Sequence, residues 1–323
     1  MFMYRCFYAL IVCSVIPVVA AGQSGMAINI DSLVRVPRIA ADSLPWHWQV
    51  KWTAGFSTTQ LTNWTQGGQD VFSVDLGTYG SYDYADSILS WDNDLHLRYG
   101  VVKQGTQSIQ KSDDRIILSS RFSRVTTDWY RYSGFVDFRT QFFDGFNNAV
   151  YDSATRGPLR ISSFFAPAFL TTAIGLDAVL LPELRVLVAP LSSRSTWVLD
   201  SRLVEYGRAD GRGVFGLAPG ISSSTSVGTA VNIKVDWEVF TNVNWRLRLN
   251  GFMPYQTPDL WIVTVENAIA MKVNSWLSVS WMADLFYDDR IPITRSDGTI
   301  GPATQFRNQV TFGFNWSMSD RPS

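Results

Sequence analysis

The chain has 323 residues, a formal net charge of −1 and no long run of one charge sign, which excludes the basic patch that a nucleic-acid partner requires. Its aromatic content of 14%, with 13 tryptophans, is high for a soluble domain and typical of a protein that borders a bilayer. Both cysteines, Cys6 and Cys13, lie near the start, so we expect no disulfide, thiolate metal site or cysteine nucleophile in the mature chain.

The first residues have the pattern of a secretory signal peptide. Basic Arg5 precedes an apolar run, and small residues end it at Ala21. We therefore predict a cleaved signal peptide at residues 1–21. A lipoprotein signal at Cys13 is the weaker alternative, because Val12 is bulky where a small residue is required.

Residues 22–45 lack a sustained hydrophobic period, and we interpret them as a periplasmic N-terminal extension. From Trp48 to Met318 strand signals follow one another without a linker or a break in composition. Residues 46–323 are therefore predicted to form one domain.

Period-two alternation marks this domain. From Leu277 to Tyr287 the odd positions are apolar, and Ser278, Ser280 and Asp284 lie between them. Such a run is too long for an ordinary strand but matches the ~9 to 11 residues that cross a bilayer as a tilted strand. Similar runs predict about twelve strands, with fourteen as the alternative. They lie near residues 48–58, 69–83, 88–103, 114–125, 128–143, 163–179, 183–191, 226–239, 243–254, 259–272, 275–288 and 305–318.

The connections between these segments alternate between short and long, which is the rule for bacterial outer-membrane barrels. The short ones lie at residues 85–87, 126–127, 181–182, 241–242 and 273–274, and the long ones include 144–162, 192–225 and 289–304. We predict an all-β fold: a transmembrane antiparallel up-and-down β-barrel of the Gram-negative outer membrane, with short periplasmic turns and long extracellular loops. Trp91, Trp245 and Trp276 each follow a short turn, where a periplasmic aromatic girdle belongs.

Two other folds fit less well. A helical membrane protein needs about 18 consecutive apolar residues, and the chain beyond the leader has no such run. A soluble β-sandwich or propeller would usually have strands of about 5 or 6 residues and a polar outer face.

Charged residues occupy the face of each strand opposite the apolar one. Leu95, Leu97 and Tyr99 point one way, so Asp94 and Arg98 point the other. A basic residue facing lipid near the midplane costs roughly 2 to 4 kcal/mol, so the charged faces must look inward. The predicted lumen-lining residues are Asp92, Asp94, His96, Arg98, Arg121, Arg131, Asp137, Arg139, Lys234, Asp236, Glu238, Arg246, Arg248, Glu266, Asp284 and Arg307.

Several separated motifs are similar to those of a known family. They include Leu61–Gly68, Ser90–Leu95, Lys111–Asp114, Ser163–Ala168 and Phe286–Asp289. With them the chain resembles an uncharacterised domain-of-unknown-function family of Bacteroidetes-type outer-membrane β-barrel proteins. The resemblance implies an outer-membrane barrel and no assigned activity.

Within the Leu61–Gly68 motif, Asn63, Trp64, Gly67 and Gly68 are more than a hairpin requires. They could contact a ligand or partner, or fold back and cap the barrel. The two readings stay open.

Catalytic and metal-binding signals are weak. Only two histidines exist, His47 and His96, so we expect no histidine metal site and no cofactor. His96 lies on the predicted inward face, unlike the histidine base that the outer-membrane phospholipase carries on its outer face, so a hydrolase is a remote alternative. A calcium site from Asp288, Asp289 and Asp297 matches no known ligand spacing, and solvated acids are favoured.

The predicted function is non-enzymatic: a narrow ion-lined pore or solute-passage protein. The alternative is a non-conducting barrel that docks a surface or secretion partner. The inward ions could pair and plug the lumen or create the transverse field of a polar pore, and this choice also stays open. Expected partners are the bilayer and lipopolysaccharide of the outer membrane, the barrel-assembly machinery, and a small solute or a surface protein. Because the chain ends in Ser319–Ser323, recognition by that machinery would rest on Phe314 or Trp316.

Overall fold

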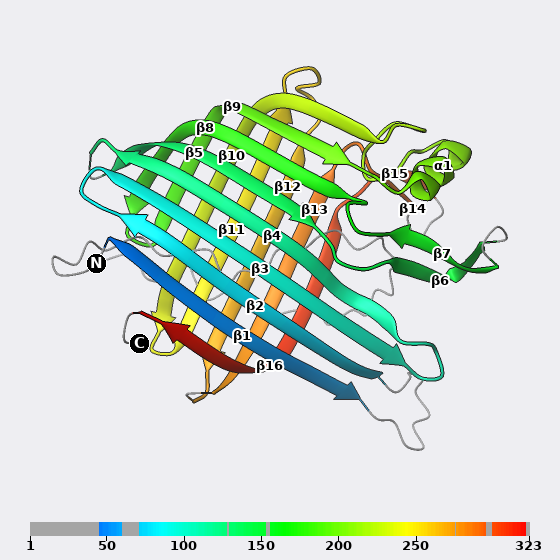
Figure 1. Cartoon of the computed structure of the whole chain (residues 1–323), viewed down its shortest axis with the longest axis horizontal. Coiled ribbons are helices and arrows are strands. Elements are labelled where there is room, and N and C mark those ends of the chain that lie inside the picture. The colour runs from blue at the N-terminus through cyan, green and yellow to red at the C-terminus, as the bar shows by residue number, and fades with distance from the viewer. Residues whose placement is uncertain are drawn as a thin grey trace, which may run out of the picture.

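The computed structural model describes residues 45–59, 71–127, 129–152, 156–274, 276–294 and 299–320. Within them, twelve strands form one closed antiparallel barrel (Figure 1). The barrel strands are β1 (Trp46–Thr59), β2 (Val71–Ala85), β3 (Leu89–Gln104), β4 (Gln110–Val125), β5 (Tyr130–Thr140), β8 (Ala168–Leu181), β9 (Leu184–Trp197), β10 (Ser223–Phe240), β11 (Val243–Pro254), β12 (Ile262–Lys272), β13 (Leu277–Asp288) and β16 (Gln305–Ser319). The predicted all-β barrel of about twelve strands is confirmed.

Neighbouring strands follow chain order except where small elements interrupt it. Going round the barrel, β5 pairs with β8, β13 with β16, and β16 closes on β1. The interruptions are two hairpins, β6 (Gly145–Asp152) with β7 (Gly157–Ser162) and β14 (Pro292–Thr294) with β15 (Ile300–Pro302), and the helix α1 (Ser201–Asp210). These elements gather at the end of the barrel opposite the labelled termini (Figure 1).

Each predicted strand overlaps one barrel strand, and the short connections lie where the alternation breaks. Asp86 shapes the β2–β3 turn, because its carboxylate accepts hydrogen bonds of 2.7 Å from the backbone N of both Ile88 and Leu89. In the β10–β11 turn Asn242 has φ 65°, a left-handed conformation that asparagine tolerates better than most residues.

The segment after β8 differs from the prediction. β9 runs to Trp197 instead of ending at 191, and β10 starts at Ser223, so the long connection shrinks to residues 198–222. Pro190, which has no N–H to donate, sits in a bulge where the pairing shifts between Gly228 and Ala230. The bulge accommodates Pro190, so β9 continues past the point where the alternation of the sequence breaks.

The shortened connection carries α1, which the sequence analysis did not predict. Asp200 caps its N-terminus by accepting a 2.9 Å hydrogen bond from the backbone N of Arg202, and Gly211 ends it with φ 73°. Leu203 of the helix is buried in a small cluster with Ala166, Val198 and Leu217. The helix therefore forms because this cluster covers one face of it, a tertiary effect.

The two faces of the barrel strands differ sharply. On β4 the outward Leu118 and Phe122 are 46% and 49% exposed, whereas the inward Arg115 and Arg121 are 2% and 4% exposed. Large exposed hydrophobic side chains recur on the other barrel strands too, for example Leu76, Ile174 and Val310. The barrel thus has an apolar outside and a charged inside, the reverse of a soluble protein.

The tryptophans beside the short turns sit in aromatic clusters. The ring of Trp91 lies 6.0 Å from that of Trp46, and the ring of Trp276 stacks 5.5 Å from that of Phe314. Trp245 pairs similarly with Trp237 on the neighbouring strand at 6.4 Å. These pairs lie near the end of the barrel that carries the short turns.

Several predicted features fall outside the described residues. They are the signal peptide at residues 1–21, the extension at 22–45 except for Pro45, and the loop residues Asn63, Trp64, Gly67 and Gly68. Of the residues that the structure describes, no helix has the length and apolar character needed to span a bilayer.

Candidate functional site in the barrel lumen

The structure buries many of the residues predicted to line the lumen. His96, Arg98, Arg121, Asp137, Arg248, Glu266 and Asp284 are almost fully buried, each 8% exposed or less. Asp92, Asp94, Arg131, Arg139, Lys234, Asp236 and Arg246 are partly buried. The side chain of Arg307 lies outside the described part of the chain, although its backbone pairs with Asp284.

Glu238 lies elsewhere. It is exposed at the end of β10, where its Oε1 accepts a 3.2 Å hydrogen bond from the backbone N of Asn242. The pairing of β10 with β11 shifts between Glu238 and Phe240, which ends the simple alternation. Glu238 therefore caps the turn, and it does not join the buried charges.

An ion cluster in the lumen surrounds Asp177, which lies on β8 four residues before its end at Leu181. Asp177 is fully buried, and its Oδ2 accepts hydrogen bonds from Arg185 and from Nη1 of Arg121 at 3.3 Å. Nη2 of Arg121 donates to Oδ1 of Asn232 at 3.4 Å. Arg121 is on β4 and Asn232 is on β10, with β5, β8 and β9 between them around the wall. The Arg121 side chain therefore leaves its own wall and narrows the lumen.

Further polar pairs lie beside this cluster. Tyr79 donates from its hydroxyl to Asp94 at 2.8 Å and packs its ring 5.0 Å from that of His96. Towards the short turns, Arg246 and Asp236 form an ion pair at 3.8 Å. The ring of His96 is therefore packed against Tyr79 inside the barrel and is 2% exposed.

A second group of charges lies on the neighbouring walls. Asp137 accepts hydrogen bonds from Arg139 and, at 2.8 Å, from the hydroxyl of Ser119. Glu266 is 0% exposed and lies in register between Arg248 on β11 and Asp284 on β13. Neither carboxyl oxygen of Glu266 has a hydrogen-bond partner among the described residues.

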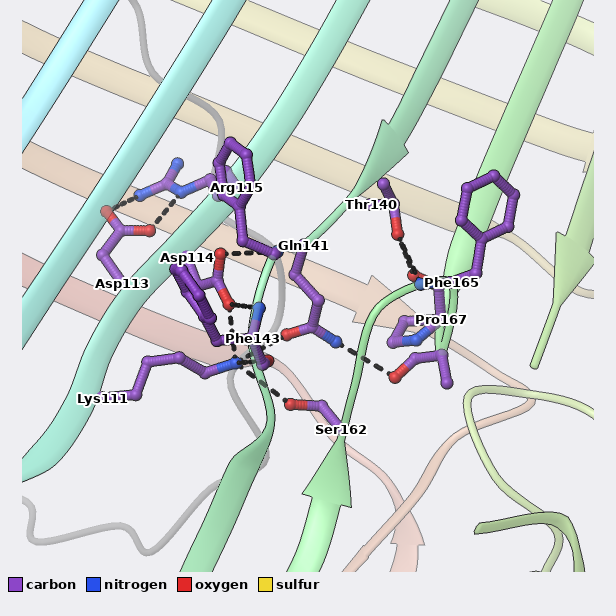
Figure 2. Close-up of polar contacts among 12 residues, drawn as sticks. Lys111, Asp113, Asp114, Arg115, Thr140, Gln141, Phe143, Ser162, Phe165 and Pro167 are labelled. Carbon is purple, nitrogen blue, oxygen red and sulfur yellow. Dashed lines mark hydrogen bonds and ion pairs between the residues drawn. The ribbon is translucent and has the colours of Figure 1, made fainter. Parts of the chain in front are cut away.

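At the end of the barrel opposite the short turns, Lys111 ties three segments together (Figure 2). Its Nζ donates to Asp114 and Gln141, both at 2.9 Å, and to the backbone O of Phe143 at 2.7 Å. Asp114 in turn accepts from the backbone N of Phe142 at 2.8 Å and of Phe143 at 2.9 Å. This node fixes the chain where it leaves β5 to form the β6–β7 hairpin.

The return of the chain into β8 is fixed by the same region (Figure 2). Nε2 of Gln141 donates to the backbone O of Ala166 at 3.0 Å, and the hydroxyl of Thr140 donates to the backbone O of Pro167 at 3.1 Å. The peptide bond between Ala166 and Pro167 is cis. The long insertion between β5 and β8 is thus anchored at both ends.

A cavity of about 170 Å³ extends from this node to Asn232, the hydrogen-bond partner of Arg121. Its lining comes from barrel strands β4, β5, β8 to β13 and β16 and from β7 of the hairpin, so it belongs to the lumen. Ion pairs line part of it, with Asp113 accepting from Arg115 at 2.5 Å. Phe215 and Ile291, from the connections after β9 and β13, also line it.

Outside the barrel wall, Asp200 joins the helix to the β6–β7 hairpin. Its Oδ2 accepts hydrogen bonds from Arg160 at 3.0 Å and from the hydroxyl of Ser163 at 3.2 Å. Burial acts to raise the pKa of Asp200, but the hydrogen bonds from Arg160, Arg202 and Ser163 outweigh it and lower the pKa below its ordinary value.

A metal site finds no support in the described part of the chain, where no three His, Asp, Glu or Cys side chains gather closely enough to hold an ion. Asp288, considered for calcium, accepts from Nε of Arg290 at 3.0 Å and from Nη2 at 2.8 Å. Asp289 accepts from the backbone N of Trp261 at 2.9 Å and from the hydroxyl of Tyr287 at 2.6 Å. Asp297 is outside the described residues.

The sequence analysis missed several lumen residues. Asp177 and Arg185 interrupt an apolar stretch and were not assigned to a face, because apolar residues such as Ala173 and Ile174 occupy both faces of β8 and hide the period-two pattern. Arg194 follows the bulge at Pro190 and was missed for the same reason. Lys111 and Asp114 carried a signal, since they belong to one of the family motifs, but the predicted strand began only at residue 114 and neither residue was assigned to a face.

Comparison with known proteins identifies one matching family model. Residues 56–146 match a protein family described as "Protein of unknown function (DUF3078)". The predicted resemblance to a domain-of-unknown-function family is confirmed over this segment, and its Bacteroidetes-type character is not tested. No curated protein matches the sequence significantly.

Solved structures that resemble the fold share little sequence with it. An outer-membrane channel from Pseudomonas putida F1 aligns over 87% of this chain and 100% of its own, with 9% identity and a TM-score of 0.40. The P. putida toluene transporter TodX covers 88% and 92% of the two chains, with 9% identity and a TM-score of 0.35. The translocator domain of the autotransporter NalP from Neisseria meningitidis covers 84% and 89%, with 11% identity and a TM-score of 0.33. Similarities this distant imply no shared function.

Proposed function

We propose that the chain is a non-enzymatic outer-membrane β-barrel whose lumen is a narrow, ion-lined passage for small polar solutes. The observation that carries this proposal is the reach of Arg121 across the lumen to Asn232, beside its ion pair with Asp177. A guanidinium held there leaves a polar constriction whose charges select what can pass.

The surface of the barrel supports the outer membrane as its location. Exposed apolar side chains suit contact with lipid, and the aromatic pairs beside the short turns suit the membrane interface. A closed barrel leaves no unpaired strand edge, which a bilayer requires. The signal peptide predicted at residues 1–21 would deliver the chain to the periplasm, from which the barrel-assembly machinery would insert it beside lipopolysaccharide.

The lumen charges favour a hydrated passage over a dry plug. Besides both oxygens of Glu266, Nε of Arg248 and Nε of Arg194 are buried without hydrogen-bond partners among the described residues. Buried polar atoms normally find partners in protein or water, so these atoms call for water or solute in the lumen. Asp177 with Arg121 and Arg185, in contrast, forms the tight part of the passage.

Conductance of the purified barrel in planar bilayers tests the proposal. We expect small, steady currents from the unaltered protein and a severalfold larger conductance with reduced anion preference after Arg121→Ala. Arg124→Ala is the matched control, because Arg124 is exposed on the same strand and should leave the currents unchanged. Silence of both the unaltered protein and the Arg121→Ala variant would refute a passage.

A non-conducting interaction barrel is the second candidate. It is favoured by exposed aromatic side chains on and beside the β6–β7 hairpin, where Phe143 is 56%, Tyr151 70% and Phe164 56% exposed. Apolar surface at this end of the barrel lies beyond the membrane-facing strands and suits contact with another protein. A silent barrel in the conductance experiment would leave this candidate standing.

A further inference from the structure

Arg194 on β9 differs from the other cations that line the lumen cavity. It has no acidic hydrogen-bond or ion-pair partner among the described residues, and its Nε is buried without a partner. The other three lining cations are each bonded to a lining carboxylate. These pairs are Lys111 with Asp114, Arg115 with Asp113, and Arg139 with Asp137. The described lining therefore carries one positive charge in excess, on Arg194.

The acidic group whose charge acts most strongly on Arg194 already has another partner. Asp288 is the acidic group that acts most strongly on Arg194. Both of its carboxylate oxygens accept hydrogen bonds from Arg290, at 3.0 and 2.8 Å. Asp288 thus attracts Arg194 from a distance without taking its donors.

A neighbouring aromatic ring positions the guanidinium. The Cζ atom of Arg194 lies 5.1 Å from the ring centroid of Phe169. Arginine favours such placement over an aromatic face, which holds the planar group without using its N–H donors. The donors of Arg194 stay available to a planar anion such as a carboxylate, which arginine can bind in bidentate fashion.

Apolar side chains make up the larger part of the remaining lining, with neutral polar side chains such as Thr171, Asn250 and Gln305 among them. Leu187, Phe252, Ile262 and Phe286 contribute to its walls, and Phe215 to the part lined by the connection after β9. Apolar walls around a few placed polar groups are the usual make-up of a small-molecule site. A bare inorganic anion would leave these walls unused, whereas an anion with a short hydrocarbon part would contact both.

We propose that this cavity binds a small organic monoanion, a carboxylate with a short apolar part, whose carboxylate pairs with Arg194. The hydrocarbon lies against the apolar walls. The inference goes beyond passage through the lumen, because equilibrium binding needs only access to the cavity from the end that carries the long connections.

Ligand-observed NMR titration of the full barrel in detergent tests it, with hexanoate, hexan-1-ol and hexylammonium as probes of matched length. We expect hexanoate to bind at least tenfold more tightly than either of the others. Arg194→Met should abolish this preference, and Arg194→Lys should keep part of it because the charge remains. Arg124→Met serves as control for partition into detergent, since Arg124 lies on the outer surface.

Equal binding of hexanoate by the unaltered protein and by folded Arg194→Met would overturn the proposal, and so would equal binding of hexanoate and hexan-1-ol by the unaltered protein. The second comparison needs no variant, so it decides the matter even if Arg194→Met fails to fold. Heat-resistant migration on gels reports folding of each variant. Absence of conductance would refute the passage and leave this binding result unaffected.

Discussion

Replacing Asp177 by asparagine should destabilise the barrel strongly. Asp177 is 0% exposed and is the shared partner of Arg121 and Arg185. The asparagine keeps the size and removes the charge, so two guanidinium groups face each other without their anion. Removing one member of a buried ion network typically costs about 3 to 5 kcal/mol, because the remaining charge stays buried and unpaired.

The destabilisation is measured as the change in the free energy of unfolding, by denaturant titration of the protein in lipid vesicles. We expect a lower midpoint at unchanged slope, corresponding to a loss of about 3 kcal/mol or more. Asp210→Asn is the matched control: Asp210 pairs with Arg212 at 3.2 Å on the exposed end of α1, and such a pair is worth about 0 to 1 kcal/mol.

The double variant Asp177→Asn/Arg185→Met should recover part of the loss, because it removes one of the two stranded cations. A loss below about 1 kcal/mol in Asp177→Asn would refute the reasoning, since it would mean that solvent in the lumen screens these charges as well as it screens surface pairs. Equal losses in the single and double variants would also contradict it.

Three further predictions address other parts of the molecule. Leu118→Arg should cost about 2 to 4 kcal/mol if its outward face meets lipid near the midplane, and vesicle insertion yield measures this; full insertion would contradict a lipid-facing position. Lys111→Met should expose the insertion between β5 and β8 to limited proteolysis, since it removes the donor for Asp114 and three other acceptors, whereas Lys103→Met on the exposed part of β3 should not. The pKa of Asp200 is lowered, so its ionised carboxylate stabilises the α1 region above the unfolded pKa of 3.8, and this stabilisation is lost as the pH falls through the lower folded pKa. Hydrogen exchange around α1 should therefore become faster over this pH range. Asp200→Asn should abolish this pH dependence.

Sequence alone determined the barrel and the faces of its regular strands. The alternation in segments such as 277–287 is sufficient, because a strand between lipid and a polar lumen must place its two residue types on opposite sides. The same alternation predicted an inward face for residues such as Arg121, Arg248 and Glu266, and these side chains are buried. These features depend on residue order within one strand, which the sequence shows directly.

Tertiary structure decided which of these charges meet. Arg121 contacts Asn232 only because the sheet closes on itself and brings β4 towards β10, and no local pattern encodes that approach. The bulge at Pro190 likewise decides that Arg194 faces the lumen, since one extra residue reverses every later side chain on the strand. The sequence therefore predicted many of the charged residues of the lumen, whereas the tertiary structure determines how they pair and leaves Arg194 as the cavity-lining cation without a carboxylate partner among the described residues.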